Sequence, residues 1–194
     1  DSSALPEQVV DAVVQSAFRS AGQRCSALRL LVLHDGIADA VIEMIRGAAG
    51  ELAAGDPALL ATDVGPVIDG EAADNIRRHL KRLESEAKPL LAPAASSAPA
   101  EGNLIAPQAY EVPSIESVTS EILGPVLQIA RWGHGTLADP AEVIERINAL
   151  GYGLTLGIQT RIDSRAQALA SRAHVGNIYV NRNIIGAVVG VQPF

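Results

Sequence analysis

Short apolar segments rich in Val, Ile and Leu alternate along this chain with segments whose apolar residues recur at helical spacing. A turn is predicted at Asp35-Gly36. The first predicted helix starts at Pro6, and its apolar pattern ends before Gly22. Further helices are predicted at 37–52, 68–86, 139–150 and 164–173. The predicted strands span 26–33, 104–112, 126–132, 154–159 and 177–181. This alternation favours an α/β fold: an open, mostly parallel sheet with helices on both faces.

The core of such a fold has to be aliphatic, because 48% of the residues are hydrophobic and only 3% are aromatic. A chain of 194 residues suits one domain or one lobe of a larger protein. The formal net charge of -7 argues against nucleic acid as a partner. No apolar run reaches the roughly 18 residues that a membrane span needs. The single cysteine excludes an internal disulfide and favours a reducing cytoplasm.

Both ends of the chain are typical of cuts within a longer polypeptide. The chain opens on Asp1 without a methionine and closes on an apolar, glycine-rich stretch that ends at Phe194. Because domain termini are usually polar and mobile, we expect residues 1–194 to be a domain truncated at both ends. The Pro-, Ala- and Ser-rich stretch 92–102 is predicted to be an exposed loop. The sequence has no glycine-rich phosphate-binding motif, so it predicts no nucleotide-phosphate site.

Cys25 is the only cysteine, and it is either a nucleophile or an ordinary buried residue. Lone cysteines of cytosolic proteins are most often buried and inert. Cys25, however, stands in a short connection between a helix and a strand, where reactive groups of α/β folds occur. Arg24 and Arg29 flank it with positive charge, which favours thiolate over thiol. A Cys–His pair is a further alternative, and no metal site is predicted, because no ligand spacing links the four histidines, His34, His79, His134 and His174.

Three segments, taken together, resemble the catalytic domain of the aldehyde dehydrogenase superfamily. They are Gly22-Gln-Arg-Cys25, Glu121-Ile-Leu-Gly-Pro-Val126, and Gly176-Asn-Ile-Tyr-Val-Asn181 followed by Gln192-Pro-Phe194. Leu123 stands where that superfamily usually has Phe. Four stretches are most similar to the L-glutamate γ-semialdehyde (1-pyrroline-5-carboxylate) dehydrogenases, especially the form fused to proline dehydrogenase in bacterial proline utilisation A: residues 16–29, 152–157, 180–183 and 186–194.

The resemblance implies roles for seven residues. Cys25 would be the nucleophile that attacks the aldehyde, and Glu121 would bind the nicotinamide ribose of NAD. Ser26 and the backbone N–H groups of Gly186 and Ala187 would hold the carboxylate of the substrate. Phe18 and Phe194 would line the aldehyde channel, although core packing is an alternative for both.

The resemblance also implies parts that lie outside residues 1–194. The general-base glutamate, an asparagine that stabilises the oxyanion, and the cofactor-binding domain would all precede Asp1. The parent enzyme would be a cytoplasmic homo-oligomer that takes a small aldehyde and NAD, with FAD only in a fused proline dehydrogenase domain. This chain alone would be inactive. Two alternatives stay open: an aldehyde dehydrogenase of other substrate specificity, and a structural or oligomerisation lobe without activity.

Overall fold

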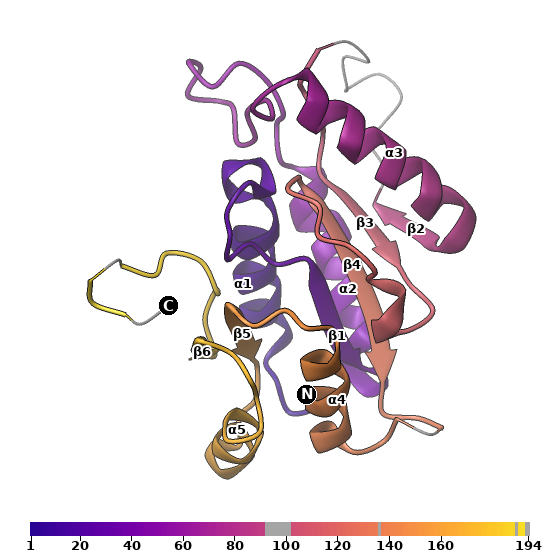
Figure 1. Cartoon of the computed structure of the whole chain (residues 1–194), viewed down its shortest axis with the longest axis vertical. Helices are drawn as coiled ribbons and strands as arrows, with labels where there is room; N and C mark the ends of the chain where they lie inside the picture. The colour runs from indigo at the N-terminus through magenta and orange to yellow at the C-terminus, as the bar shows by residue number, and fades with distance from the viewer. Residues whose placement is uncertain (92–101, 136, 189, 193–194) are drawn as a thin grey trace.

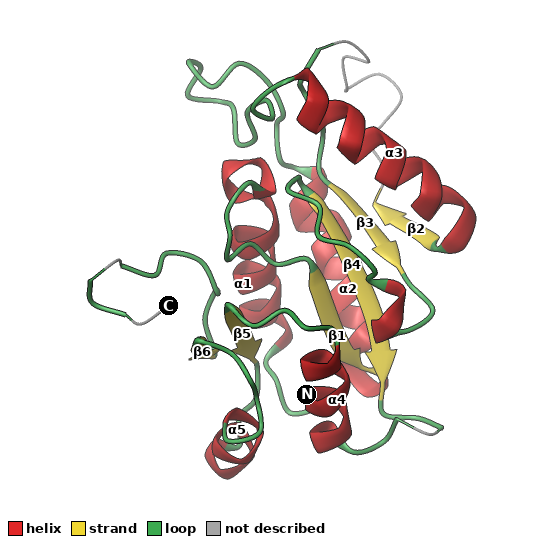
Figure 2. Ribbon diagram, viewed as in Figure 1, coloured by secondary structure: helices red, strands yellow, loops and turns green. Residues whose placement is uncertain are grey.

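The computed structural model describes residues 1–91, 102–135, 137–188 and 190–192. Helices and strands alternate along this part of the chain (Figure 1; Figure 2). The α-helices are α1 (Pro6–Phe18), α2 (Asp35–Gly50), α3 (Gly70–Glu86), α4 (Pro140–Ala149) and α5 (Asp163–Ala170). The strands are β1 (Leu30–His34), β2 (Lys88–Leu91), β3 (Gln108–Glu111), β4 (Val126–Trp132), β5 (Thr155–Ile158) and β6 (Asn177–Val180). Two short 3-10 helices span Arg19–Gly22 and Ile115–Ser117.

Four strands form the main sheet in the order β1-β4-β3-β2. β4 runs parallel to β1, with Leu30 opposite Gln128, and parallel to β3 on its other side. β2 pairs antiparallel with β3 at the edge of the sheet. The sequence did not predict β2, in which Pro89 is tolerated because an edge strand needs fewer N–H donors. The sheet is open and mostly parallel, as predicted.

Helices cover both faces of this sheet, which confirms the predicted fold class. Successive residues of β4 point to opposite faces. Leu127 and Ile129 join a core with α1 and α2, whereas Ala130 and Trp132 join a second core with α3 and α4. In Figure 2, α2 lies behind the sheet and α4 in front of it. The two cores therefore hold β1 and β4 at fixed positions in the middle of the molecule.

β5 and β6 form a separate two-stranded parallel sheet, with Thr155 opposite Asn177. α5 connects them, and a small third core joins α4, β5 and α5 through Ile144, Ile158 and Leu169. Among the described residues, no helix combines the length and the apolar composition that crossing a membrane requires.

Asp35 and Gly36 do not form the predicted turn, because they open α2 directly after β1. The His34 side chain accepts the Gly36 N–H through Nδ1 at 2.9 Å and so caps the helix. The negative charge of Asp35 lies in the first turn, where it interacts favourably with the positive end of the helix dipole and stabilises α2. The loop predicted at 92–102 lies, apart from its last residue, outside the described residues.

Candidate active site

Cys25 lies in a tight turn between α1 and β1. The N–H of Ala27 donates to the Arg24 carbonyl at 3.1 Å, which makes Cys25 and Ser26 the two central residues of the turn. Cys25 is exposed, whereas Ser26 is buried. The structure therefore contradicts the alternative of a buried cysteine, and the thiol is accessible to a small molecule.

The backbone that leads into this turn has a rare conformation. Ser20, Ala21 and Gly22 have successive φ angles of 56°, 53° and 64°. The left-handed region costs about 1–2 kcal/mol for each residue other than glycine. Hydrogen bonds to Ser20 offset part of this cost: the Gln23 N–H donates to its carbonyl at 3.0 Å and Arg24 Nε to its hydroxyl at 2.9 Å. The segment reverses the chain within a few residues and delivers Cys25 to the start of β1.

A contact between two glycines brings the Cys25 and Glu121 segments together. A Cβ atom on Gly22 would lie 2.1 Å from the carbonyl oxygen of Gly124. A Cβ atom on Gly124 would in turn lie 2.6 Å from the Ile76 side chain of α3. Both motifs therefore need glycine for close approach of the backbone, which is a physical reason for their sequences.

Glu121 and Cys25 lie at the same edge of the sheet. Glu121 precedes β4 and Cys25 precedes β1, and the amino ends of neighbouring parallel strands meet at one edge. Arg29 Nε lies 3.9 Å from Glu121 Oε1, and 44% of the Glu121 side chain is exposed. Ligands of open α/β sheets more often bind at the carboxyl ends of the strands. This candidate site lies instead at the amino ends of β1 and β4.

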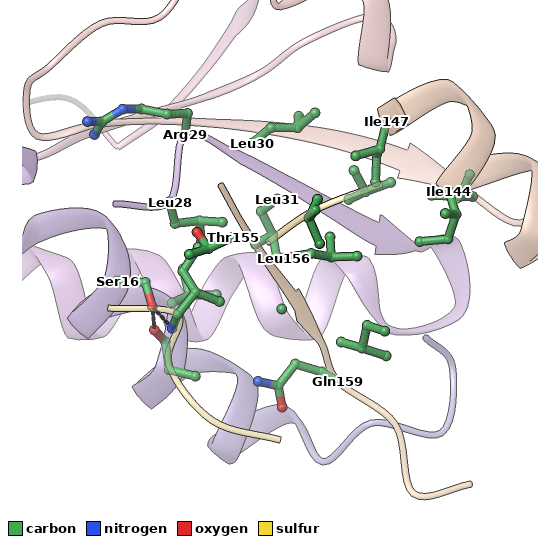
Figure 3. A pocket seen from close by; sticks show the side chains of 18 of the residues that line it. Ser16, Leu28, Arg29, Leu30, Leu31, Ile144, Ile147, Thr155, Leu156 and Gln159 are labelled. Carbon is green, nitrogen blue, oxygen red and sulfur yellow. Dashed lines mark hydrogen bonds between the residues drawn. The ribbon is translucent and has the colours of Figure 1, made fainter. Parts of the chain in front are cut away.

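A cleft of about 430 Å³ opens between β1 and β5. Figure 3 shows aliphatic side chains that line it, among them Leu30 and Leu31 of β1, Leu156 of β5 and Ile144 of α4. Cys25, Arg29 and Glu121 are among its lining residues. The part of the lining that the structure describes contains no histidine.

The segment after β6 runs along α1 toward the Cys25 end of the molecule. Gln8 Nε2 donates to the Asn181 carbonyl at 2.9 Å, and Asn183 Nδ2 donates to Gln15 Oε1 at 3.0 Å. These two contacts lie about two helical turns apart, since Gln8 is near the start of α1 and Gln15 near its end. Gly186, two residues beyond Ile184, is thereby brought toward the edge at which Cys25 lies.

Ser16 joins this segment to the Cys25 segment. Its hydroxyl accepts the Ile184 N–H at 3.1 Å and donates to the Ala12 carbonyl at 2.6 Å, as Figure 3 shows around Ser16. Its carbonyl accepts the Leu28 N–H at 2.9 Å. Sequence reasoning gave Ser16 no role, although a polar residue beside the apolar positions of α1 is a signal that could have been followed.

The predicted substrate-binding residues have different surroundings. Gly186 is exposed with a φ of 85°, in the left-handed region that favours glycine, and Ala187 is half-buried. Phe18 is only 1% exposed and belongs to the core with α2, which agrees with the packing alternative. Phe194 lies outside the described residues.

The histidines lie elsewhere. His34 caps α2 at the carboxyl end of β1, where its ring packs edge-on against Trp132, and His134 Nδ1 is 2.6 Å from Asp35 Oδ2. His79 is buried in α3, where burial and the charge of Arg82 lower its pKa to about 4. Within the described residues no group of His, Cys, Asp and Glu could hold a metal ion.

Comparison with known proteins identifies the family to which this chain belongs. Residues 2–194 match the model of the aldehyde dehydrogenase family. The chain belongs to the aldehyde dehydrogenase family. Its relatives in this family include the bifunctional protein PutA of Escherichia coli K12, which is 50% identical over the whole chain. The 1-pyrroline-5-carboxylate dehydrogenase of Geobacillus kaustophilus is 32% identical, also over the whole chain.

Solved aldehyde dehydrogenase structures have the same fold. The chain superposes on a Bradyrhizobium japonicum proline utilization A mutant with a TM-score of 0.93 and 52% identity. A Thermus 1-pyrroline-5-carboxylate dehydrogenase with bound NAD gives a TM-score of 0.89 and 35% identity. This aldehyde dehydrogenase chain spans 15% of the Escherichia coli protein and 37% of the Geobacillus enzyme. It covers 19% and 36% of the two solved chains.

Proposed function

We propose that residues 1–194 form the nucleophile-bearing catalytic domain of a longer NAD-dependent dehydrogenase. This enzyme would oxidise L-glutamate γ-semialdehyde to L-glutamate in proline catabolism. The observation that carries the proposal is the exposed Cys25 at the tip of a turn, on the same cleft and sheet edge as Glu121. Relatives named as PutA and as 1-pyrroline-5-carboxylate dehydrogenases match the whole chain, which supports the substrate.

The reaction begins at Cys25. Its thiolate adds to the aldehyde carbon, and the carbonyl oxygen becomes an oxyanion that accepts a hydrogen bond from the Cys25 N–H. Bound NAD would supply the acceptor for the hydride that leaves this carbon. The product on Cys25 is a thioester, which water hydrolyses to glutamate while the sulfur leaves as thiolate. Covalent catalysis by Cys25 thus divides the oxidation into two easier steps.

Glu121 is accessible to a bound ribose. Its side chain is 44% exposed, and Oε1 faces Arg29. An accessible carboxylate can accept hydrogen bonds from two neighbouring hydroxyls. We therefore assign Glu121 to the nicotinamide ribose of NAD.

The backbone around Gly186 and Ala187 is the proposed anchor for the substrate carboxylate, together with the Ser26 hydroxyl. Gly186 has no side chain that would keep an anion away from the backbone N–H groups. The hydrogen bonds at Gln15 and Ser16 direct this segment toward the Cys25 end of α1. We assign Phe18 no place in the aldehyde channel, because its side chain is packed in the core.

Other parts of the longer enzyme would complete the site. The cleft between β1 and β5 is lined mainly by aliphatic side chains. Apolar surface of this kind is usually covered by another part of a protein. We propose that the remaining protein covers it and supplies the general base, the second oxyanion donor and the cofactor-binding domain.

The test uses the longer enzyme that contains these residues. Formation of NADH is followed with L-glutamate γ-semialdehyde and with propanal, which lacks the carboxylate. We expect a strong preference for the semialdehyde and loss of activity in Cys25→Ala. Equal efficiency with both aldehydes would refute the carboxylate anchor. A Cys25→Ala enzyme that retains its turnover would refute the nucleophile.

A further inference from the structure

Arg29 contacts both the Cys25 turn and Glu121. It immediately precedes β1, and its carbonyl accepts the Gln128 N–H of β4 at 2.9 Å. The backbone of Arg29 is therefore fixed on the main sheet. Its side chain is 14% exposed and lies at the end of the cleft (Figure 3).

The guanidinium of Arg29 reaches the peptide that contains the Cys25 N–H. Arg29 Nη2 donates to the Arg24 carbonyl at 3.1 Å. A peptide unit is planar, and its C=O and N–H point in opposite directions. Fixing the Arg24 carbonyl therefore also fixes the direction of the Cys25 N–H. A hydrogen bond from a charged donor polarises this peptide and makes its N–H a better donor.

The same guanidinium also faces Glu121, with Nε 3.9 Å from Oε1. The planar guanidinium donates to the Arg24 carbonyl, and its delocalised charge faces Glu121 without a hydrogen bond. One side chain thus positions both the peptide of the nucleophile and the carboxylate assigned to NAD.

Arg29 is not explained by stability alone. Within the described residues, Nε and Nη1 are buried and make no hydrogen bond. Burial lowers the pKa of the guanidinium, and the charge of Glu121 opposes this shift. A partly satisfied buried charge is costly, and an apolar residue of similar size is often at least as stable. The cost indicates a role other than holding the fold together.

We propose that Arg29 is the positioning residue of this active site. It aims the Cys25 N–H at the oxyanion and holds Glu121 for the cofactor ribose. The catalytic part of this role rests on the proposed dehydrogenase function.

Two measurements test the role independently. The first uses the 194-residue chain and follows the NMR resonances of the Arg24–Cys25 peptide. Arg29→Gln is expected to move the Arg24 carbonyl carbon upfield and to shift the Cys25 amide nitrogen, since the carbonyl loses its charged donor. Glu121→Gln is expected to leave both resonances unchanged, because Arg29 keeps its bond to Arg24.

The second measurement uses steady-state kinetics of the longer enzyme. Arg29→Gln is expected to lower kcat about tenfold, because one oxyanion donor is misaligned, and to raise the KM for NAD about threefold. Arg29→Lys keeps a charge beside Glu121, so it is expected to restore the KM for NAD but not kcat. Arg19→Gln is the matched control: it removes the same charge from an exposed position six residues before Cys25 and is expected to change neither parameter.

Three results would overturn the proposal. They are unchanged peptide resonances in Arg29→Gln, wild-type kcat in Arg29→Gln, and an equal loss of kcat in Arg19→Gln. If Arg29→Gln fails to fold, Arg29→Lys decides: wild-type kcat then refutes the role. If the wild-type enzyme oxidises no aldehyde, the dehydrogenase function fails, and the peptide resonances still decide whether Arg29 positions the Cys25 peptide.

Discussion

Replacing Gly22 with alanine tests the contact that joins the two parts of the active site. Two costs add. An L-residue at a φ of 64° loses about 1–2 kcal/mol. The new Cβ would also lie 2.1 Å from the Gly124 carbonyl oxygen, and a forced backbone shift of this kind costs about 1–3 kcal/mol. We expect Gly22→Ala to lower the free energy of unfolding by about 2–5 kcal/mol, a large share of the roughly 5–15 kcal/mol of a typical domain.

Urea denaturation measures this loss, with the fluorescence of the single tryptophan, Trp132, as the signal. Gly124→Ala is expected to cost less, because its Cβ meets the flexible end of the Ile76 side chain rather than a backbone atom. Gly47→Ala is the control. Gly47 lies within α2 with nothing near its Cβ position, so alanine should stabilise the helix by up to about 1 kcal/mol. A Gly22→Ala chain as stable as the wild type would falsify the reasoning.

Three further predictions concern stability. His79 has its pKa lowered from 6.5 to about 4 in the folded state, so the unfolded chain binds the proton more readily. Stability should therefore fall by at most about 3 kcal/mol as the pH drops from 6.5 to 4, and urea titrations of His79→Leu should show a flatter pH dependence. Ser16→Ala leaves the Ile184 N–H without its acceptor and should cost about 1–3 kcal/mol, with faster hydrogen exchange at that amide. Asp69→Ala removes the cap that accepts the Ala72 N–H at 2.8 Å, and should lower the thermal midpoint through a loss of about 1 kcal/mol.

Most helices and strands could be predicted because their apolar periodicity is strong. The helix that starts at Pro6 is a clear case, since it buries every third to fourth residue in one core. The strand at 126–132 is another, since alternate residues of it enter the same core. The two errors have local causes. Asp35-Gly36 has the composition of a turn, but His34 caps a helix there through its side chain. β2 follows α3 after one residue, so no turn residues in the sequence mark where the strand begins.

The candidate site could be predicted in part. The motifs around Cys25 and Glu121 predicted a role for each residue, and both roles stay predictions. The parallel order of β1 and β4 explains why the two residues lie at the same end of the sheet. The sequence could not show that Arg29 bonds to the Arg24 carbonyl, because a contact between a side chain and a peptide five residues away depends on the turn between them. Nor could it choose between the core and the aldehyde channel for Phe18, since an apolar side chain at the end of a helix suits both surroundings.

The hydrogen bonds at Ser16 have a consequence for the order of folding. The Leu28 contact closes a loop of a dozen residues, whereas the Ile184 contact spans 168 residues of sequence. Closing a longer loop costs more conformational entropy, and contacts between distant residues slow folding. The Cys25 turn is therefore expected to form early with α1 and β1. The segment that carries Gly186 docks late, so the nucleophile is in place before the part of the site that selects the substrate.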